Sequence, residues 1–222
     1  MTHRLLVIVA LAFGPALFAG EEPTRVPLEI KLPRPMFTGT KKDFKLQPWM
    51  EKPLGKPRPP FLAPEGTTNV ALRKPVTSSD KEPFTGNIEM VTDGDKEGID
   101  GSFVELGPER QWVQLDLQAP YSIYAIVIWH YHGESRLYHD VVVQLADDAD
   151  LITNVRTIFN NDHDSSSGLG VGKDLEYFEN NEGKLIDAKG ENARFVRLYS
   201  RGNSSSDQNH YTELEVYGKP VK

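Results

Sequence analysis

The sequence predicts an all-β protein whose main domain is a jelly-roll β-sandwich of eight strands. From Thr67 onward, short runs rich in valine, isoleucine and aromatic residues alternate with clusters of glycine, aspartate, asparagine and serine. No helical period of apolar residues persists over a useful window in this part of the chain. About eight strands fit into the roughly 150 residues available, and a jelly roll is the natural packing for that number.

The predicted strands differ in their apolar pattern. In residues 111–117, Val113, Leu115 and Leu117 occupy alternate positions, which is typical of a strand with one buried face. Residues 124–130 instead form a nearly continuous apolar run, which suits a strand in the middle of a two-sheet sandwich that is covered on both faces. Further strands are predicted at residues 139–148, 155–162, 193–200 and 211–218.

Residues 1–19 have the pattern of a signal peptide. His3 and Arg4 precede an apolar run from Leu5 to Phe18, and small residues and two glutamates follow it. The run is shorter than the roughly 20 residues that a membrane-spanning helix needs, and no later segment approaches that length. We therefore expect a secreted or periplasmic protein without a membrane span. Because an exported chain without cysteine has no disulfides, we expect a bacterial source.

Residues 20–66 form a proline-rich linker, since ten of the sixteen prolines fall in this region. Proline removes backbone donors, so neither a central strand nor a helix is expected here. We expect a semi-rigid spacer in front of a domain at residues 67–219. The alternative is a strap whose aromatic residues dock on the domain or on a partner protein. These aromatic residues are Phe37, Phe44, Trp49 and Phe61.

The charge of the chain excludes some classes of partner. The formal net charge is −7 and the isoelectric point is near 5.4, so phosphate backbones and anionic lipid surfaces are repelled. Nucleic acid and membranes are therefore not expected as partners. Neutral polymers such as glycans, and cations, remain compatible with this charge as partners.

The stretch from Trp129 to Asp140, WHYHGESRLYHD, contains three of the six histidines. If the preceding strand continues, His130 and His132 share one face about 6.6 Å apart along the backbone. Two imidazoles so placed can reach one metal ion, with a third ligand from one of three other histidines. Those candidates are His139, His163 and His210.

Three interpretations of this stretch remain open. In the first, imidazoles and neighbouring polar groups supply hydrogen bonds to sugar hydroxyls, and tyrosines offer a flat apolar face to a sugar ring. In the second, the histidines bind a transition metal, with or without a catalytic role. In the third, they satisfy turns and bind nothing. Arg136 favours the first over the second, because a fixed cation opposes a bound divalent ion.

The sequence contains no motif that requires catalysis. A nucleophile elbow, an HExxH motif and a phosphate-binding glycine loop are all absent. The segment GLGVGKD carries three glycines, but no apolar helix follows it, so it lacks the context of a phosphate loop. We therefore expect a protein that is not an enzyme.

Six segments in order, between Asn69 and Gly218, carry a family resemblance. They are NVALRKPVTSS, VTDGD, QWVQLDL, YAIVIWHY, ARFVRLYS and TELEVYG. Together they resemble the discoidin or factor V/VIII type C family of galactose-binding-like domains, and they are similar to bacterial carbohydrate-binding modules. The resemblance implies an eight-stranded jelly roll, usually without catalysis, whose loops at one end bind sugars, lipids or proteins.

The resemblance also implies a structural calcium ion. Its ligands would be the carbonyls of Met90, Asp95 and Thr212, the side chains of Asp93 and Glu213, and the oxygens of Ser102. Calcium takes six to eight oxygen ligands, and an Asp-Gly turn directs carbonyls and a carboxylate inward, so this set is chemically sensible. Members of this family often have a tryptophan shortly after the Asp-Gly turn, whereas this sequence has Phe103 there. Asp100 is the alternative to Ser102 as a calcium ligand. On the residues alone, the same segment is also compatible with a solvated surface turn.

We therefore predict an exported, non-catalytic binding module that recognises an extracellular glycan or glycoprotein, with calcium as a structural cofactor. The alternative is a histidine-ligated transition-metal protein, possibly catalytic. The candidate ligand-binding residues are His130, Tyr131, His132, Arg136, Tyr138, His139, Asp162, His163, Asn209 and His210.

Overall fold

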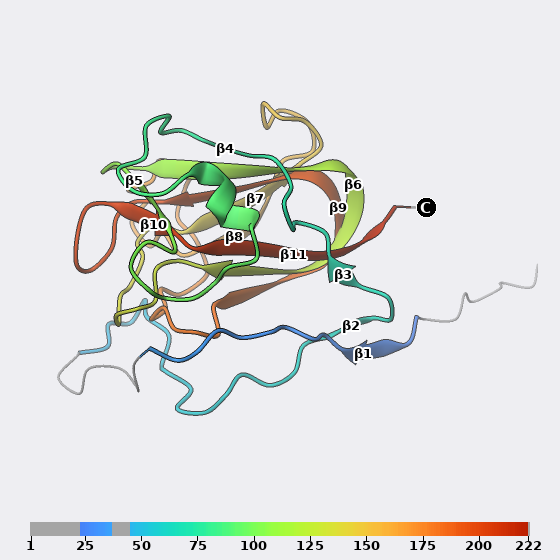
Figure 1. Cartoon of the computed structure of the whole chain (residues 1–222), viewed down its shortest axis with the longest axis horizontal. Helices are drawn as coiled ribbons and strands as arrows, with labels where there is room; N and C mark the ends of the chain where they lie inside the picture. The colour runs from blue at the N-terminus through green and yellow to red at the C-terminus, as the bar shows by residue number, and fades with distance from the viewer. Residues whose placement is uncertain (1–22, 37–44, 222) are drawn as a thin grey trace, which may run out of the picture.

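The computed structural model of the protein describes residues 23–36 and 45–221, and Figure 1 shows the whole chain. The predicted signal peptide lies outside the described residues. The described part is all-β apart from one short 3-10 helix, η1 (Ile88–Thr92), as the sequence predicted. None of the described residues belongs to a helix that is long and apolar enough to cross a membrane.

Two antiparallel layers form a sandwich, and two long strands run through both of them. Most strands lie in one continuous ladder in the order β3-β11-β6-β9-β7-β8, with β4 also paired to β6. Two further pairs, β1 with β2 and β5 with β10, lie outside this ladder. The strands are β1 (Arg25–Pro27), β2 (Leu62–Pro64), β3 (Thr68–Asn69), β4 (Val76–Ser78), β5 (Val104–Leu106), β6 (Gln111–Trp129), β7 (Val142–Ala146), β8 (Arg156–Asn160), β9 (Lys184–Ser200), β10 (Asn209–Tyr211) and β11 (Glu213–Pro220).

Strand β6 contains two of the predicted strands. Its first part pairs with the end of β9, its second part pairs with the start of β9, and the register shifts between Asp116 and Tyr121. Gln118 has a positive φ of 67° at this shift, so the chain bends there without ending the strand. The long ribbons of β6 and β9 therefore pass from one layer to the other at the right of Figure 1.

The core lies between the two layers. Alternate residues of β6, β7, β9 and β11 point into it, and most of its aliphatic side chains have no exposed surface. These strands contribute Val113, Leu115, Ile126, Ile128, Val143, Leu145, Val196, Leu198, Leu214 and Val216. The alternation that the sequence shows in residues 111–117 is thus the inward face of one layer.

A second apolar cluster explains the continuous apolar run at residues 124–130. Ala125, Val127 and Trp129 point out of the sandwich and are fully buried, because part of the proline-rich segment covers them. Side chains of this segment that pack there include Leu28, Ile30 and Phe61. Covering on both faces was predicted for this strand, and one of the two covers is the segment that we expected to be a spacer.

The proline-rich segment is therefore a strap, which we define as residues 23–36 and 45–66. Strands β1 and β2 pair with each other in it, and the Leu28 amide donates to the Phe61 carbonyl at 2.8 Å. The Arg58 guanidinium donates to the Gly183 carbonyl at 2.9 Å, and the Asn181 side chain donates to the Pro33 carbonyl at 3.2 Å.

The spacer interpretation is wrong for the described part of this segment, and the alternative of a docked strap describes it. Prolines exclude the segment from the central sheet but leave its apolar side chains free to dock. Two of the four aromatic residues that we predicted for docking, Phe37 and Phe44, lie outside the described residues.

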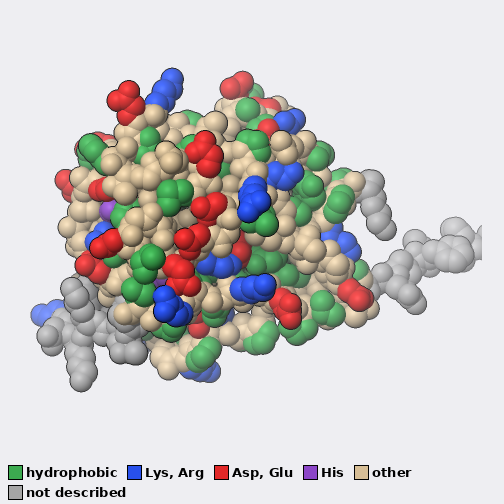
Figure 2. Space-filling model, viewed as in Figure 1, with side chains coloured by type: hydrophobic (Ala, Val, Ile, Leu, Met, Phe, Trp, Pro, Cys, Tyr) green, Lys and Arg blue, Asp and Glu red, His purple; other side chains and the backbone are tan. Residues whose placement is uncertain are grey.

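Charge complementarity accompanies this docking. Residues 67–222 contain 15 lysines and arginines but 26 aspartates and glutamates. The strap as defined contains seven basic and three acidic residues. Acidic side chains are spread over the domain in the view of Figure 2, so the basic strap lies against a domain of opposite charge.

Candidate functional site

The loops on both sides of β6 in the sequence, together with the loops after β8 and β9, gather at one end of the sandwich, at the left of Figure 1. We call this the loop end. It comprises residues 107–110, 130–141, 160–176 and 201–209. The strap segment that begins at residue 45 also reaches it.

His139 is a predicted binding residue that remains accessible to solvent at the loop end. Its side chain is 39% exposed, and its Nδ1 lies 2.8 Å from Oε1 of the buried Glu176. This hydrogen bond raises the pKa of His139 above its usual value, and the charge of Glu176 acts in the same direction. Nε2 has no protein partner among the described hydrogen bonds. The imidazole is thus held in one orientation by one nitrogen.

Arg201 lies next to His139, because its amide donates to the His139 carbonyl at 2.9 Å. Its guanidinium contacts Glu109 at 3.1 Å, and this contact raises the pKa of Arg201. Asp164 is close enough to contribute to the same shift. The loop end therefore holds an imidazole and a guanidinium on two paired backbone segments, together with two exposed carboxylates near the guanidinium, which are groups that hydrogen-bond hydroxyls.

Asp162 supports this loop from inside. It is fully buried, and its carboxylate accepts hydrogen bonds from the backbone amides of Asp164, Ser166 and Ser167. Carboxylate oxygens of Asp140, Asp162 and Asp164 lie within 4.8 Å of one another, a group that could hold a metal ion. Because the hydrogen bonds already satisfy Asp162, we interpret it as the residue that shapes the loop.

His130 and His132 turn into the protein and do not share an exposed face. His130 Nδ1 lies 2.9 Å from Glu179 Oε2, and its ring stacks on Tyr138 with centroids 4.2 Å apart. His132 Nε2 lies 2.8 Å from the Lys96 carbonyl. Both side chains have no exposed surface. Their assignment as glycan ligands therefore needs correction, because β6 ends at Trp129 and the following residues fold inward.

The described residues do not bring three histidines to one metal ion. Among them, the one group of three or more acidic or histidine side chains whose ligand atoms lie within 4.8 Å of one another consists of the three aspartates at the loop end. His163 stacks on Trp49, and burial lowers the pKa of His210 to about 4. The alternative of a histidine-ligated metal is not supported by this part of the chain: His130 and His210 both contact the Tyr138 ring, while His132, His139 and His163 have other partners.

The other predicted binding residues are mostly buried as well. Tyr131, Tyr138, Asn209 and His210 are each at most 8% exposed. Asn209 joins neighbouring loops, since its side-chain amide donates to the carbonyls of Gly107 and Glu109. Of the ten candidate residues, only Arg136, His139 and His163 are not buried. The buried ones position the loop end and do not form its surface.

Glu109 and Arg201 at the loop end, and the exposed Phe84 outside it, are not among the residues predicted from the sequence. Phe84 is 68% exposed on the turn between β4 and η1, and its amide donates to the Glu105 carbonyl at 2.8 Å. An aromatic residue inside the polar turn SDKEPFTGN was the available signal. No pattern in the sequence marks Glu109 or Arg201, because these two residues come into contact only in the folded chain.

The predicted calcium ligands lie close together beside η1. Met90 belongs to η1, Asp93 caps it, and Glu213 begins β11 next to Thr212. The Gly94 amide donates to Glu213 Oε2 at 3.2 Å, which joins the Asp-Gly turn to the end of the chain.

The chemistry of these residues fits a cation. Glu213 Oε1 and Thr212 Oγ1 are buried and have no hydrogen-bond partner. Burial, followed by the charges of Glu215 and Asp93, raises the pKa of Glu213 to about 9. A buried carboxylate beside other acidic groups is costly unless a cation neutralises it, so the donor set suits calcium.

The histidine-rich stretch supports this same region. His132 contacts the Lys96 carbonyl, and the Tyr131 hydroxyl donates to Asp100 Oδ1 at 3.1 Å. Ser102 Oγ donates to Asp95 Oδ2 at 3.3 Å, so Ser102 lies with the predicted ligands. Residues 130–132 therefore hold the loop of residues 95–102 in place.

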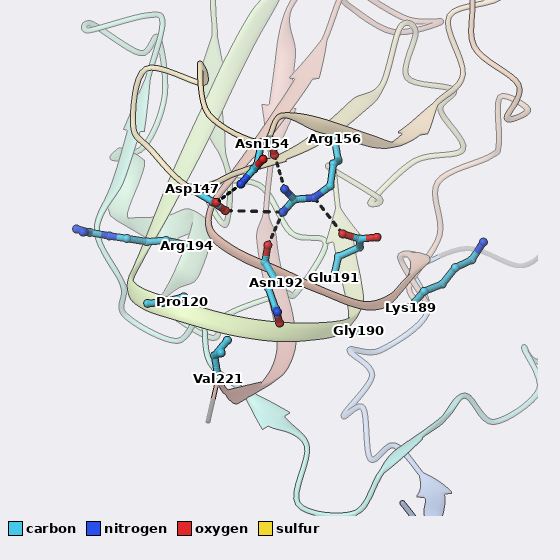
Figure 3. A pocket seen from close by; sticks show the side chains of 10 residues that line it. All are labelled: Pro120, Asp147, Asn154, Arg156, Lys189, Gly190, Glu191, Asn192, Arg194 and Val221. Carbon is cyan, nitrogen blue, oxygen red and sulfur yellow. Dashed lines mark hydrogen bonds and ion pairs between the residues drawn. The ribbon is translucent and has the colours of Figure 1, made fainter. Parts of the chain in front are cut away.

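A polar pocket of about 760 Å³ occupies the opposite end of the sandwich (Figure 3). Arg156 lies at its centre, 3.0 Å from Glu191 and 3.9 Å from Asp147. The Asn154 side chain donates to Asp147 at 2.7 Å. None of the predicted binding residues lines this pocket.

Comparison with known proteins shows what kind of fold this is. A doubly substituted CpGH89 from Clostridium perfringens, in complex with GlcNAc-alpha-1,4-galactose, matches with a TM-score of 0.50 and 20% identity over 69% of this chain and 15% of that chain. The chain has the galactose-binding-like jelly-roll fold. No protein-family model matches the sequence, and no curated protein does.

Other solved structures with similar folds are individual modules. A chitosan-binding module of a chitosanase/glucanase from Paenibacillus sp. IK-5 has a TM-score of 0.49 and 18% identity over 68% of this chain and 99% of that chain. A fucose-binding module from Streptococcus pneumoniae has a TM-score of 0.49 and 22% identity over 68% of this chain and 97% of that chain.

Proposed function

We propose that the protein is an exported, non-catalytic module that binds carbohydrate at its loop end. The observation that carries this proposal is that the loop end pairs the backbone of His139, whose accessible imidazole is oriented by Glu176, with that of Arg201, whose guanidinium lies near the carboxylates of Glu109 and Asp164. Sugar hydroxyls both donate and accept hydrogen bonds, so a mixed array of fixed donors and acceptors suits them. The solved structures with a similar fold include a chitosan-binding module and a fucose-binding module, which is consistent with the proposal.

We also propose that calcium stabilises the module. The carboxylates of Asp93 and Glu213, the carbonyls of Met90, Asp95 and Thr212, and Ser102 would hold it. The buried, unpartnered Oε1 of Glu213 supports this assignment. The ion would join η1 to β11 and so connect two segments that are far apart in the sequence.

The proposal is tested with the mature protein on a glycan array, followed by calorimetry with the best-bound sugar. His139→Ala and Arg201→Ala should each weaken binding about tenfold, since each removes a hydrogen bond that involves a charged or polarised group. Lys189→Ala, in the pocket at the opposite end, is the matched control and should bind as the wild type does.

This comparison distinguishes binding at the loop end from binding in the pocket at the opposite end. Weaker binding in Lys189→Ala with normal binding in the loop-end variants would move the site to the pocket around Arg156. Absence of any glycan binding would contradict the proposed function.

A further inference from the structure

The strap carries an aromatic side chain to the loop end. The ring of Trp49 lies parallel to that of His163, with centroids 4.6 Å apart and an interplanar angle of 7°. His163 is exposed and Trp49 is partly exposed, so the stacked pair keeps aromatic surface accessible to solvent. His163 precedes Asp164, one of the polar groups of the proposed glycan site.

Backbone hydrogen bonds hold Trp49 in this position. The Glu176 amide donates to the Trp49 carbonyl at 2.9 Å, and the Glu51 amide donates to the Glu176 carbonyl at 2.7 Å. The Glu51 side chain also forms an ion pair with Lys184. The indole is thus fixed before any ligand arrives, which lowers the entropy cost of binding to it.

Glu176 connects Trp49 with the polar part of the loop end. Its backbone pairs with the strap on both sides of Met50, while its carboxylate holds His139 Nδ1 at 2.8 Å. One buried residue therefore sets the position of the hydrogen-bonding imidazole and of the aromatic surface. The two lie at a fixed separation on the same end of the protein.

Trp49 differs from a side chain that only anchors the strap. Trp129, which lies under the strap, has no exposed surface and donates its Nε1 hydrogen to the Asn181 carbonyl at 3.0 Å. Trp49 keeps exposed surface and stacks on a side chain that is itself exposed. A flat, partly exposed aromatic surface next to hydrogen-bonding groups is the usual composition of a small-molecule site.

We propose that Trp49 and His163 form a second subsite of the glycan site, so that the ligand is an oligosaccharide. One sugar is hydrogen-bonded at His139 and Arg201, and the apolar face of another pyranose ring lies on the Trp49 and His163 surface. This inference rests on the proposed function and adds that the strap is part of the binding site.

The experiment measures whether affinity increases with the length of the sugar chain, and whether this increase requires Trp49. Galactose, glucosamine and N-acetylglucosamine are titrated by calorimetry into the mature protein, each as the monosaccharide and as its tetrasaccharide. We expect at least one tetrasaccharide to bind about tenfold more tightly than its monosaccharide, as two linked contacts do. Trp49→Ala should remove this difference and leave monosaccharide binding unchanged, and Trp49→Phe should keep most of it.

Leu54→Ala is the matched control on the strap, because Leu54 is 65% exposed and lines a pocket to which neither Trp49 nor His163 contributes. Circular dichroism and thermal melting confirm that each variant is folded. Intrinsic fluorescence gives a second measurement, since the wild-type signal should change with the tetrasaccharide and Trp49→Ala should not respond.

The outcomes separate the two proposals. Equal affinity for mono- and tetrasaccharide in the wild type, or a tetrasaccharide preference that survives Trp49→Ala, overturns the subsite and leaves the proposed function intact. If the wild type binds none of the six sugars and no glycan on the array, both proposals are overturned.

Discussion

The Gly94 amide donates a hydrogen bond to Oε2 of Glu213, at 3.2 Å, while Oε1 of the same carboxylate is buried without a partner. The Asp-Gly turn and the start of β11 are thereby joined through one half of a carboxylate. Asp93 is close enough for its charge to help raise the pKa of Glu213, and a bound cation would neutralise both carboxylates.

Calcium should therefore stabilise the protein. A ligand that binds only the folded state at a concentration about a hundredfold above its Kd adds about 2.7 kcal/mol, which corresponds to a rise in Tm of roughly 5–10 °C for a domain of this size. Glu213→Gln should abolish this rise. Thermal melts in calcium and in excess EDTA measure it, and a wild-type melt that EDTA leaves unchanged would contradict the calcium site.

His132→Ala should weaken calcium binding although His132 is not one of the proposed calcium ligands. His132 holds the Lys96 carbonyl at 2.8 Å, so its loss frees the loop that carries Asp95 and Ser102. Residues that support metal ligands typically contribute about 10- to 100-fold to metal affinity. Calcium titration followed by calorimetry checks this, with His139→Ala as the control that should leave calcium affinity unchanged. Equal affinity in His132→Ala and the wild type would remove the supporting role.

Phe61→Ala should destabilise the protein, because Phe61 covers the outer face of β6 near Trp129. Removal of a fully buried phenylalanine costs about 3–5 kcal/mol, and Phe61 is partly exposed, so we expect about 2 kcal/mol. Leu54→Ala, on the exposed part of the strap, should change stability by less than about 0.5 kcal/mol. Urea denaturation measures both values. Equal stability of Phe61→Ala and the wild type would mean that the strap contributes little.

The strands could be predicted from the sequence because their patterns are local. Alternation in residues 111–117 and the apolar run in residues 124–130 directly report which faces are buried. The docking of the strap could not be predicted in the same way. Its apolar residues, such as Leu28 and Phe61, are far apart in a proline-rich sequence that has no regular spacing of apolar residues. They pack on the outer face of β6, which only the folded domain provides.

The binding residues were harder to predict than the fold. The sequence shows His130 and His132 two positions apart but does not show that β6 ends at Trp129. Once the strand ends, the spacing of two no longer places both imidazoles on one surface. Arg201 and Glu109 come from loops nearly a hundred residues apart, and their contact depends on the packing of the whole loop end.

The last prediction concerns the pH dependence of the His139 and Glu176 pair. The hydrogen bond with Glu176 and the nearby charge of Asp140 raise the pKa of His139 in the folded protein. A raised pKa means that folding favours the protonated imidazole. Its contribution to stability is therefore fully present below the unfolded pKa of about 6.5 and is lost as the pH rises through the folded pKa.

His139→Gln should consequently lower the Tm more at pH 5.5 than at pH 8.5. The same substitution in a Glu176→Gln background should show no such difference, because the carboxylate that favours the protonated imidazole is gone. Thermal melts of the four proteins at the two pH values make the measurement. If His139→Gln lowers the Tm equally at both values, protonation of His139 is not coupled to folding, and the imidazole is held by a hydrogen bond whose strength does not depend on its charge.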